Sequence, residues 1–365
     1  MKFIILIARI LVAVTFIFSG FVKLVDPLGS AYKFEEYFSP NVLNLEFLIP
    51  FVIPFSILLI LAEIMLGVML LLGYKPKLTT WSLFGITLIF LFLTWYSAYY
   101  DKVTDCGCFG DAITLTPWET FYKNIVLLVL ILILLIHQTN IKPLLSENGM
   151  KWSTFGAFFV FLYLSYHVLQ HLPLIDFRPY AVGKNIPEGM IIPEGAKEDV
   201  YENTWIYEVN GEEKAYSSEE KPWEIDGANF VDRKTKLIEK GYTPPIHDFS
   251  MEKGDEDLTD LLMQKEKLML IVVYNISKTN MKVMPQVKEL TTKALQEGYD
   301  VYALTASPVA EFQQLKQAFN LDFESLFCDD ITLKTMVRAN PGIITLQKGT
   351  ITGKWNGNDA ADVSL

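Results

Sequence analysis

The sequence has only three cysteines in 365 residues, and it lacks the motifs of several large enzyme classes. It contains no nucleotide-phosphate loop, no His-Glu-x-x-His zinc motif, no serine nucleophile elbow and no internal repeat. Lys and Arg total 31 against 42 Asp and Glu, and the basic residues form no patch. Nucleic-acid binding is therefore not expected.

Hydrophobic residues are abundant instead, at 51% of the chain, and their long uncharged runs end at about residue 172. Up to that point ten basic residues balance ten acidic ones, so the whole net charge of −11 belongs to the remainder. This division predicts a membrane-embedded first half followed by a soluble, acidic second half.

Five stretches are long and apolar enough to cross the hydrocarbon core of a membrane as helices. The first is expected to be an uncleaved anchor rather than a signal peptide, because its apolar core is long and Lys23 stands at its end. The predicted spans are residues 3–24, 48–72, 79–98, 118–136 and 152–172.

Charges in the loops predict the orientation of these spans. Lys75 and Lys77 lie in a short loop without acidic residues, and such loops stay in the cytoplasm. Alternating helices then place the N-terminus in the cytoplasm and everything after residue 172 outside it. We therefore expect a protein of the bacterial inner membrane, held in the lipid bilayer, whose C-terminal half lies in the periplasm.

The loop after the third span contains a cysteine pair, Cys106 and Cys108, on either side of Gly107. A disulfide across one residue closes a small strained ring that is easy to reduce, so the pair favours a redox-active role outside the cytosol. An inert disulfide or packed loop, and a soft-metal site, are the alternatives. No metal is expected, because the loop supplies no His or Met as a further ligand.

Three segments resemble the DoxX/MauE family of membrane proteins: Ser19–Pro27, Leu61–Gly73 and the cysteine motif. The resemblance covers about residues 1–140 and implies a four-helix core, to which this chain adds a fifth transmembrane helix within 141–172. MauE itself is associated with maturing a disulfide-rich periplasmic subunit during methylamine utilisation. The whole arrangement is similar to DoxX-type proteins of Bacteroidota.

Helical-bundle oxidoreductases of the vitamin K epoxide reductase type offer a comparison for the chemistry. They pass electrons from thiols to a quinone through two cysteine pairs, whereas this chain has one pair. The comparison leaves a complete internal relay in doubt. A quinone and another thiol protein are the two candidate electron acceptors.

Glu63 lies inside the second predicted span, where an ionisable side chain is costly unless it has a partner or a function. Arg9, in the first span, has a similar predicted depth, so we predict an Arg9–Glu63 pair. The pair is interpreted as structural, with a proton relay as the alternative. Ala31–Phe38 is predicted to be a short interfacial helix, either a lid over the cysteine loop or a plain connector.

The second half is predicted to contain a β-rich spacer, 173–245, and an α/β domain, 246–365. Asn210-Gly211 marks the turn of a hairpin in the spacer. From about 246 to 357 the alternation of strands and helices resembles the thioredoxin fold. The predicted fold class is therefore an α-helical membrane bundle followed by an α/β thioredoxin-like domain.

The thioredoxin-like domain lacks the redox motif of its family. That motif would fall at 277–280, which holds no cysteine, so the domain is not expected to do dithiol chemistry. Pro341 matches the family's cis-proline beside a peptide-binding groove, which Ser277 and Asn280 would also border. Cys328 is predicted to be a buried small side chain rather than a reactive thiol.

Two hypotheses for function follow. In the first, Cys106 and Cys108 carry out thiol–disulfide exchange with periplasmic client proteins, which the redox-silent domain binds or positions. In the second, the chain is a non-enzymatic membrane scaffold that docks onto a larger envelope complex.

Overall fold

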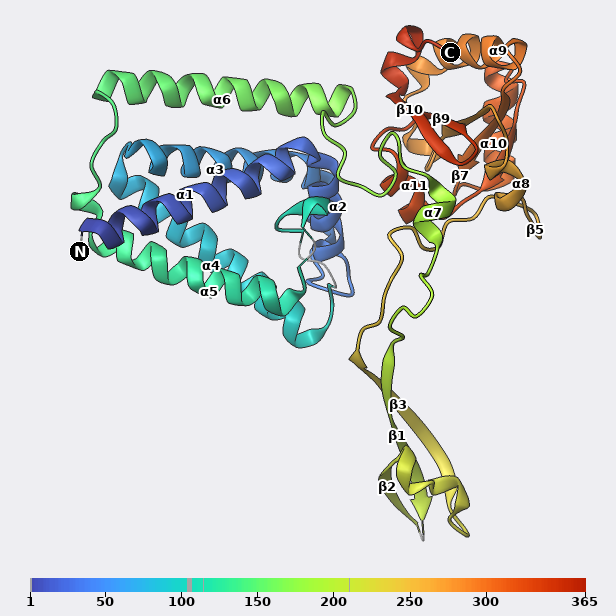
Figure 1. The fold of residues 1–365 in the computed structure, drawn as a ribbon, viewed down its shortest axis with the longest axis horizontal. Coiled ribbons are helices and arrows are strands. Elements are labelled where there is room, and N and C mark those ends of the chain that lie inside the picture. Colours follow the sequence, from blue (N-terminus) through green and yellow to red (C-terminus); the bar gives the residue numbers. More distant parts are fainter. Residues whose placement is uncertain (1, 104–106, 114, 210) are drawn as a thin grey trace. The chain divides into compact units, whose positions relative to one another are not determined.

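The computed structural model describes residues 2–103, 107–113, 115–209 and 211–365 (Figure 1). By internal contacts the chain divides into two compact units. The first unit combines Met1–Lys184 with Ser250–Leu365, and the second is Asn185–Phe249. The first unit therefore contains both the apolar helices and the larger of the two sheets.

The apolar part is built from helices whose ends follow local sequence signals. The side chain of Asp26 caps α2 by accepting from the backbone N–H of Gly29, and Pro27 takes the first helical position. Thr116 begins α5 with a capping box. The helices are α1 (Lys2–Val25), α2 (Pro27–Phe38), α3 (Val52–Leu72), α4 (Pro76–Tyr100), α5 (Pro117–Ile136) and α6 (Glu147–Gln170).

Helices α1 and α3 run side by side (Figure 1) because glycine keeps their backbones close together. A Cβ added to Gly20 of α1 would lie 2.8 Å from the backbone nitrogen of Ile64 in α3. One added to Gly67 of α3 would lie 3.0 Å from the carbonyl oxygen of Ala13 in α1. Small residues at such crossings give membrane helices the close van der Waals contact that drives their association.

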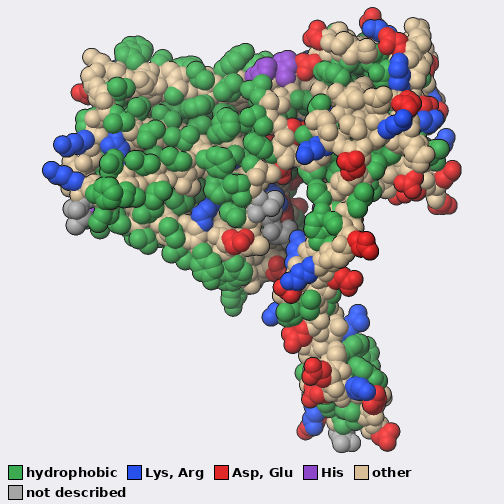
Figure 2. Space-filling view, viewed as in Figure 1, with side chains coloured by type: hydrophobic (Ala, Val, Ile, Leu, Met, Phe, Trp, Pro, Cys, Tyr) green, Lys and Arg blue, Asp and Glu red, His purple; other side chains and the backbone are tan. Residues whose placement is uncertain are grey.

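The structure places a helix at each of the five predicted spans, and each helix is long and apolar enough to cross a membrane. Hydrophobic side chains gather over the surface of this bundle (Figure 2). The predicted short helix over 31–38 is also present, as α2, and it begins four residues earlier than predicted, at Pro27.

The C-terminal part of the first unit is a seven-stranded sheet in the order β10-β9-β6-β7-β8-β4-β5. Strands β6, β7 and β8 are parallel neighbours, while β9 lies antiparallel to β6 and β10 antiparallel to β9. The strands are β4 (Glu252–Lys253), β5 (Glu256–Asp257), β6 (Leu268–Val272), β7 (Asp300–Thr305), β8 (Glu324–Phe327), β9 (Gly342–Gln347) and β10 (Thr350–Asn356).

Strand β6 is buried along its whole length, as expected for a central strand of a sheet covered by helices. Met269 and Ile271 of β6 pack in one hydrophobic core with Val287 of α9 and Phe312 of α10. The predicted alternation of strands and helices over this region is confirmed. The helices are α8 (Thr259–Met263), α9 (Met284–Gln296), α10 (Val309–Phe319) and α11 (Asp330–Met336).

The second unit contains a short helix, α7 (Ile186–Met190), and a three-stranded antiparallel sheet in the order β2-β1-β3. Its strands are β1 (Val200–Val209), β2 (Glu212–Ser217) and β3 (Asn229–Glu239). Val209 pairs with Glu212, which confirms the predicted hairpin, although Asn210 of its turn lies outside the described residues.

Candidate functional site

The cysteine loop, residues 107–112, lies against the C-terminal end of α1. Cys106 falls outside the described residues, so Cys108 is the member of the pair that the structure describes. Gly107 and Gly110 both have positive φ, 62° and 51°, which glycine adopts without steric cost. A Cβ on Gly110 would lie 3.1 Å from Val22 of α1, and one on Gly107 would lie 3.1 Å from Lys33 of α2. The loop is thus packed on both helices.

Cys108 is half-buried, and its carbonyl oxygen is bonded to the bundle. The Ser19 hydroxyl of α1 donates a hydrogen bond to this oxygen at 2.8 Å. The ring of Phe109 packs 5.4 Å from the ring of Phe18 and lies under the ammonium of Lys123 at 4.4 Å. Residues of α1 and α5 therefore hold the middle of the cysteine loop in place.

Directly beneath this loop lies a buried ion pair between Lys23 of α1 and Glu63 of α3. The Lys23 Nζ is 2.6 Å from Glu63 Oε1 and 2.9 Å from Oε2, and Glu63 is fully buried. Ser19 is also 2.8 Å from Glu63 Oε2, and Lys23 donates to the Ser19 hydroxyl at 3.1 Å. Ser19 therefore joins the ion pair to the backbone of Cys108.

The predicted Arg9–Glu63 pair is wrong. Arg9 instead donates to the carbonyl oxygens of Leu70, Leu71 and Lys142 at 2.7–2.9 Å. The last carbonyls of a helix have no intrahelical partner, so the C-terminal end of α3 offers Arg9 acceptors without any acid. Glu63 lies seven residues before Leu70, or about 10 Å along the helix, so the two charges do not share a depth.

A small cavity of about 20 Å³ lies beside the ion pair, and Cys108 forms part of its wall. Ser19, Glu63, Thr87 and Asn124 also line it. The Thr87 hydroxyl is buried and has no hydrogen-bond partner among the described residues. The cavity is about the size of one water molecule, and polar groups form part of its wall.

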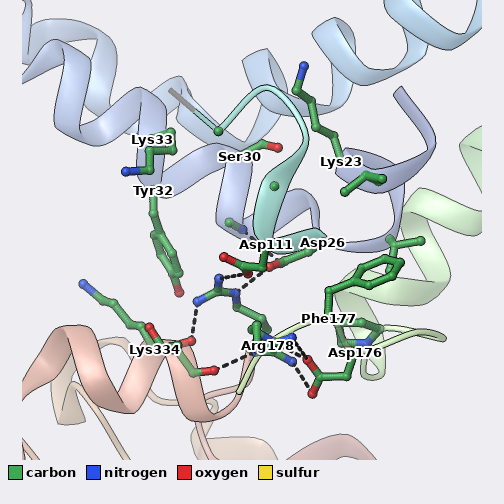
Figure 3. Close-up of a pocket in the computed structure, with 18 of the residues that line it drawn as sticks. Lys23, Asp26, Ser30, Tyr32, Lys33, Asp111, Asp176, Phe177, Arg178 and Lys334 are labelled. Atoms are coloured by element: carbon green, nitrogen blue, oxygen red, sulfur yellow. Dashed lines mark hydrogen bonds and ion pairs between the residues drawn. The ribbon is translucent and has the colours of Figure 1, made fainter. Parts of the chain in front are cut away.

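A larger cavity of about 530 Å³ opens on the other side of the cysteine loop (Figure 3). Gly107, Gly110 and Asp111 of the loop line it together with the end of α1 and with α2. Segment 173–178 and the helix α11 form the facing wall. This cavity lies where the apolar helices meet the sheet domain.

Arg338, just after α11, joins the two walls. Its guanidinium lies 2.8 Å from a carboxylate oxygen of Asp26 and 3.6 Å from one of Asp111 in the cysteine loop, and it packs over the ring of Tyr32. Burial alone would lower the pKa of Arg338, but the charges of Asp26 and Asp111 raise it. The sheet domain thus contacts the cysteine loop through a buried arginine.

A second cluster of charged side chains, around Asp176, lies near the one around Arg338. Asp176 accepts from Arg178 at 2.7 and 3.0 Å and from Lys354 of β10 at 2.6 Å. Burial tends to raise the pKa of Asp176, but these two cations lower it. Burial, with the nearby charge of Arg178, lowers the pKa of Lys354 to about 8.

The cations that line the large cavity are neutralised by neighbouring acids. Lys23 pairs with Glu63, Lys33 with Glu36, Lys334 with Asp330, and Arg178 and Arg338 with the acids described above. Burial raises the pKa of Tyr32, which also lines the cavity, and Tyr274 adds to this shift. The charges that line the cavity are therefore balanced.

The residues predicted to border a peptide groove lie together in the sheet domain. The Asn340–Pro341 bond is cis, as predicted, and the backbone N–H of Asn280 donates to the Asn340 carbonyl at 2.9 Å. Ser277 bonds to Asn275 within its own turn. Cys328 is fully buried, as predicted, and burial raises its thiol pKa to about 12. Groove binding itself stays a prediction.

Sequence reasoning missed two partners at this site. Lys23 was treated as a residue at the end of a span, although Ser19 and Lys23 are four residues apart and share a helix face with Glu63 as their neighbour. That spacing was a usable signal. The Asp26–Arg338 contact joins residues 312 positions apart, and no local pattern announces it.

Two parts of the chain match models of known protein families. The family model described as methylamine utilisation protein MauE matches residues 1–137. Residues 1–137 are a MauE-family membrane domain. This MauE domain contains α1 to α5 and the cysteine loop. Residues 201–240, which cover most of the three-stranded sheet, match a domain of unknown function, DUF8463. A search of curated proteins found no significant match.

Among the described residues no group of three or more His, Cys, Asp or Glu side chains is placed to hold a metal ion. The chemistry that the site offers is that of a half-buried cysteine on a fixed loop, between a buried ion pair and a cavity whose charges are balanced.

Proposed function

We propose that the chain is a bacterial inner-membrane protein that carries out thiol–disulfide exchange through Cys106 and Cys108. The observation that carries this proposal is the position of Cys108. It stands half-buried on a loop that two glycines shape, and that loop borders a cavity of about 530 Å³. A partner molecule in the cavity would contact the cysteine loop.

The proposed exchange moves two electrons between the pair and a client. One cysteine thiolate attacks a client disulfide and forms a mixed disulfide, releasing one client thiolate. The second cysteine then attacks its partner's sulfur, which leaves a Cys106–Cys108 disulfide and a fully reduced client. The reverse sequence oxidises a client dithiol, and a quinone or another thiol protein then takes the two electrons from the reduced pair.

We infer that the C-terminal domain is thioredoxin-like and positions the client. Strands β7, β6, β9 and β10 are neighbours in that order, and the cis-proline stands next to the segment where the redox motif would be. Because 277–280 contains no cysteine, the domain would contribute binding and not electrons. Arg338, close to the cis-proline, contacts Asp26 and Asp111, so a client bound to the domain would lie near the cysteine loop.

The trapping of a mixed disulfide tests this function. The full chain with Cys108→Ala and Cys328→Ala keeps Cys106 as its sole thiol and cannot resolve a mixed disulfide. With scrambled-disulfide ribonuclease as the probe, we expect a covalent adduct that reducing agent removes, whereas the chain with both pair cysteines should not accumulate it. The proposal would be contradicted if this adduct formed no faster than the adduct of free glutathione with the same probe.

The proposed orientation has its own test. A membrane-impermeant maleimide added to spheroplasts should label the pair in the reduced Cys328→Ala variant, because the cysteine loop would face the periplasm. Lys77→Cys, at an exposed position in a chain without other cysteines, should stay unlabelled until the membrane is opened. The opposite pattern would reverse the orientation.

One observation favours a second candidate, a non-enzymatic membrane scaffold. The ion pairs Arg338–Asp26 and Lys354–Asp176 are largely buried and join parts of the chain that are far apart in sequence. Such contacts suit a rigid platform as well as a redox protein. A platform would keep its function when both pair cysteines are replaced by serine, whereas the exchange function would be lost.

A further inference from the structure

We propose that the buried Lys23–Glu63 pair sets the balance between the thiol and disulfide forms of the cysteine pair through the charge that it presents beneath Cys108. This inference deepens the proposed function and rests on it. Lys23, Glu63 and Ser19 are positioning residues in this account, because they act on the sulfur through the loop and the local field.

Proximity is the first support. Glu63 and Cys108 line the same cavity of about 20 Å³, and a single side chain, that of Ser19, bonds to both residues. The Ser19 hydroxyl has one proton but two acceptors within 2.8 Å, the carboxylate of Glu63 and the carbonyl of Cys108. A change in the charge of Glu63 therefore changes the hydrogen bond that holds the cysteine loop.

Burial is the second support. Glu63 is 0% exposed and Lys23 is 6% exposed, so water screens neither charge well. In surroundings of low effective dielectric a unit charge acts over several ångströms with an energy large enough to shift a chemical equilibrium. As a pair the two charges nearly cancel, and the removal of either one exposes the cysteine to the other.

The sign of each effect follows from the charge that remains. Glu63→Gln leaves the ammonium of Lys23 uncompensated, and a nearby cation stabilises a thiolate, which belongs to the reduced form. A stabilised reduced form makes the disulfide a stronger oxidant. Lys23→Met leaves the carboxylate of Glu63 and has the opposite effect. A merely structural pair would instead give changes of the same kind in both variants.

The experiment is a redox titration of the purified full chain in detergent, in glutathione buffers at about pH 8, with the free thiols counted by alkylation and mass. For the equilibrium that forms the disulfide, Glu63→Gln should lower the constant about tenfold and Lys23→Met should raise it about tenfold. A tenfold change corresponds to about 30 mV for this two-electron couple. The double variant should return to within about threefold of the parent.

Ser56→Ala is the matched control, because Ser56 lies in α3, the helix of Glu63. The substitution removes a buried hydroxyl, which donates to the carbonyl of Pro27, and it changes no charge. The equilibrium constant for disulfide formation in Ser56→Ala should equal that of the parent chain. If a single-charge variant does not fold, Ser19→Ala tests the link, and the constant should then move by at least about threefold from the parent as the loop loses its bond to the bundle.

Each outcome decides one question. Shifts of opposite sign with recovery in the double variant support the inference. Equal constants in all folded variants, Ser19→Ala included, or shifts of the same sign in both single variants, overturn it while the exchange function stands. A pair that does not titrate at all in the parent chain refutes the exchange function, and this inference with it.

Discussion

Arg9 and Lys23 lie fourteen residues apart on the same buried face of α1, and the protein neutralises them in two different ways. Arg9 is bound by three backbone carbonyls at the end of α3 and after α5, and by no carboxylate in the described part of the chain. Lys23 is bound by the fully buried carboxylate of Glu63. One region uses partial charges of the backbone, and the other uses a full counter-charge.

The difference follows from the state of the backbone at each place. At a helix end the carbonyls lack intrahelical partners and gain from an arginine, whose forked guanidinium bonds several of them at once. Inside a helix every carbonyl is already bonded, so a lysine needs an acid from a neighbouring helix. A buried acid far from any helix end therefore indicates a lysine or arginine at its own depth.

The largest loss of stability is expected when the Lys23–Glu63 ion pair is broken. Lys23→Ala leaves Glu63 buried without its partner, which should cost about 3–5 kcal/mol of unfolding free energy, measured by denaturation in detergent. Replacing the pair together, as Lys23→Met with Glu63→Leu, should cost much less because no charge remains unpaired. If the single and double variants lose the same stability, the pair is not the source of the loss.

The cation outside the apolar helices, Arg338, extends the comparison. Arg338→Met removes its bonds to Asp26 and Asp111 and should cost about 2 kcal/mol, as for a charged hydrogen bond whose acid can still reach water in part. Arg338→Lys should recover some of this loss because the charge remains. Equal stability of Arg338→Met and the parent would show that the contact between the domains contributes nothing.

A smaller loss is expected at Arg9. Arg9→Met removes bonds to three carbonyls but leaves no unpaired charge, so the cost should be about 1–2 kcal/mol. The same denaturation measurement compares it with Lys23→Ala. A loss at Arg9 as large as that at Lys23 would break the distinction between backbone and counter-charge.

The last effect is one of pH, and it is expected at Lys354. Because burial lowers its pKa to about 8 in the folded protein, the unfolded chain holds more protons between about pH 8 and 10.5. Stability contributed by this group therefore rises with pH across that window, and it is lost as pH falls through 8. Relative to Lys354→Met, the parent should gain stability from pH 8 to 10; a parallel pH profile of the two proteins would contradict this.

Much of the fold could be predicted because the patterns that define it are local. The five apolar helices follow from run length and from caps such as Thr116-Pro117, and the strands and helices of the C-terminal domain follow from their periodicity. The place of Pro341 in its cis peptide bond was also predicted correctly. The relation between the sheet domain and the MauE domain was not, because Arg338 meets Asp26 across 312 residues.

The candidate site was predicted in part. Cys108 and Glu63 were both singled out, and the structure places them around one small cavity. The predicted partner of Glu63 was wrong, because the backbone carbonyls at the end of α3 and at Lys142 bind Arg9 instead. The pairing of Lys23 was not predicted because a lysine at the end of a span is usually solvated, and only the packing of α1 against α3 shows that it is buried.

The central claim is that Cys106 and Cys108 gain and lose a bond as a pair, and a glutathione titration of the unmodified full chain tests it most directly. The account predicts that two alkylatable thiols appear together over one transition in the folded protein, while Cys328, fully buried, stays unmodified until the chain is unfolded. A pair that remains in one state across the whole range of buffers, or that titrates as two independent thiols, would contradict it.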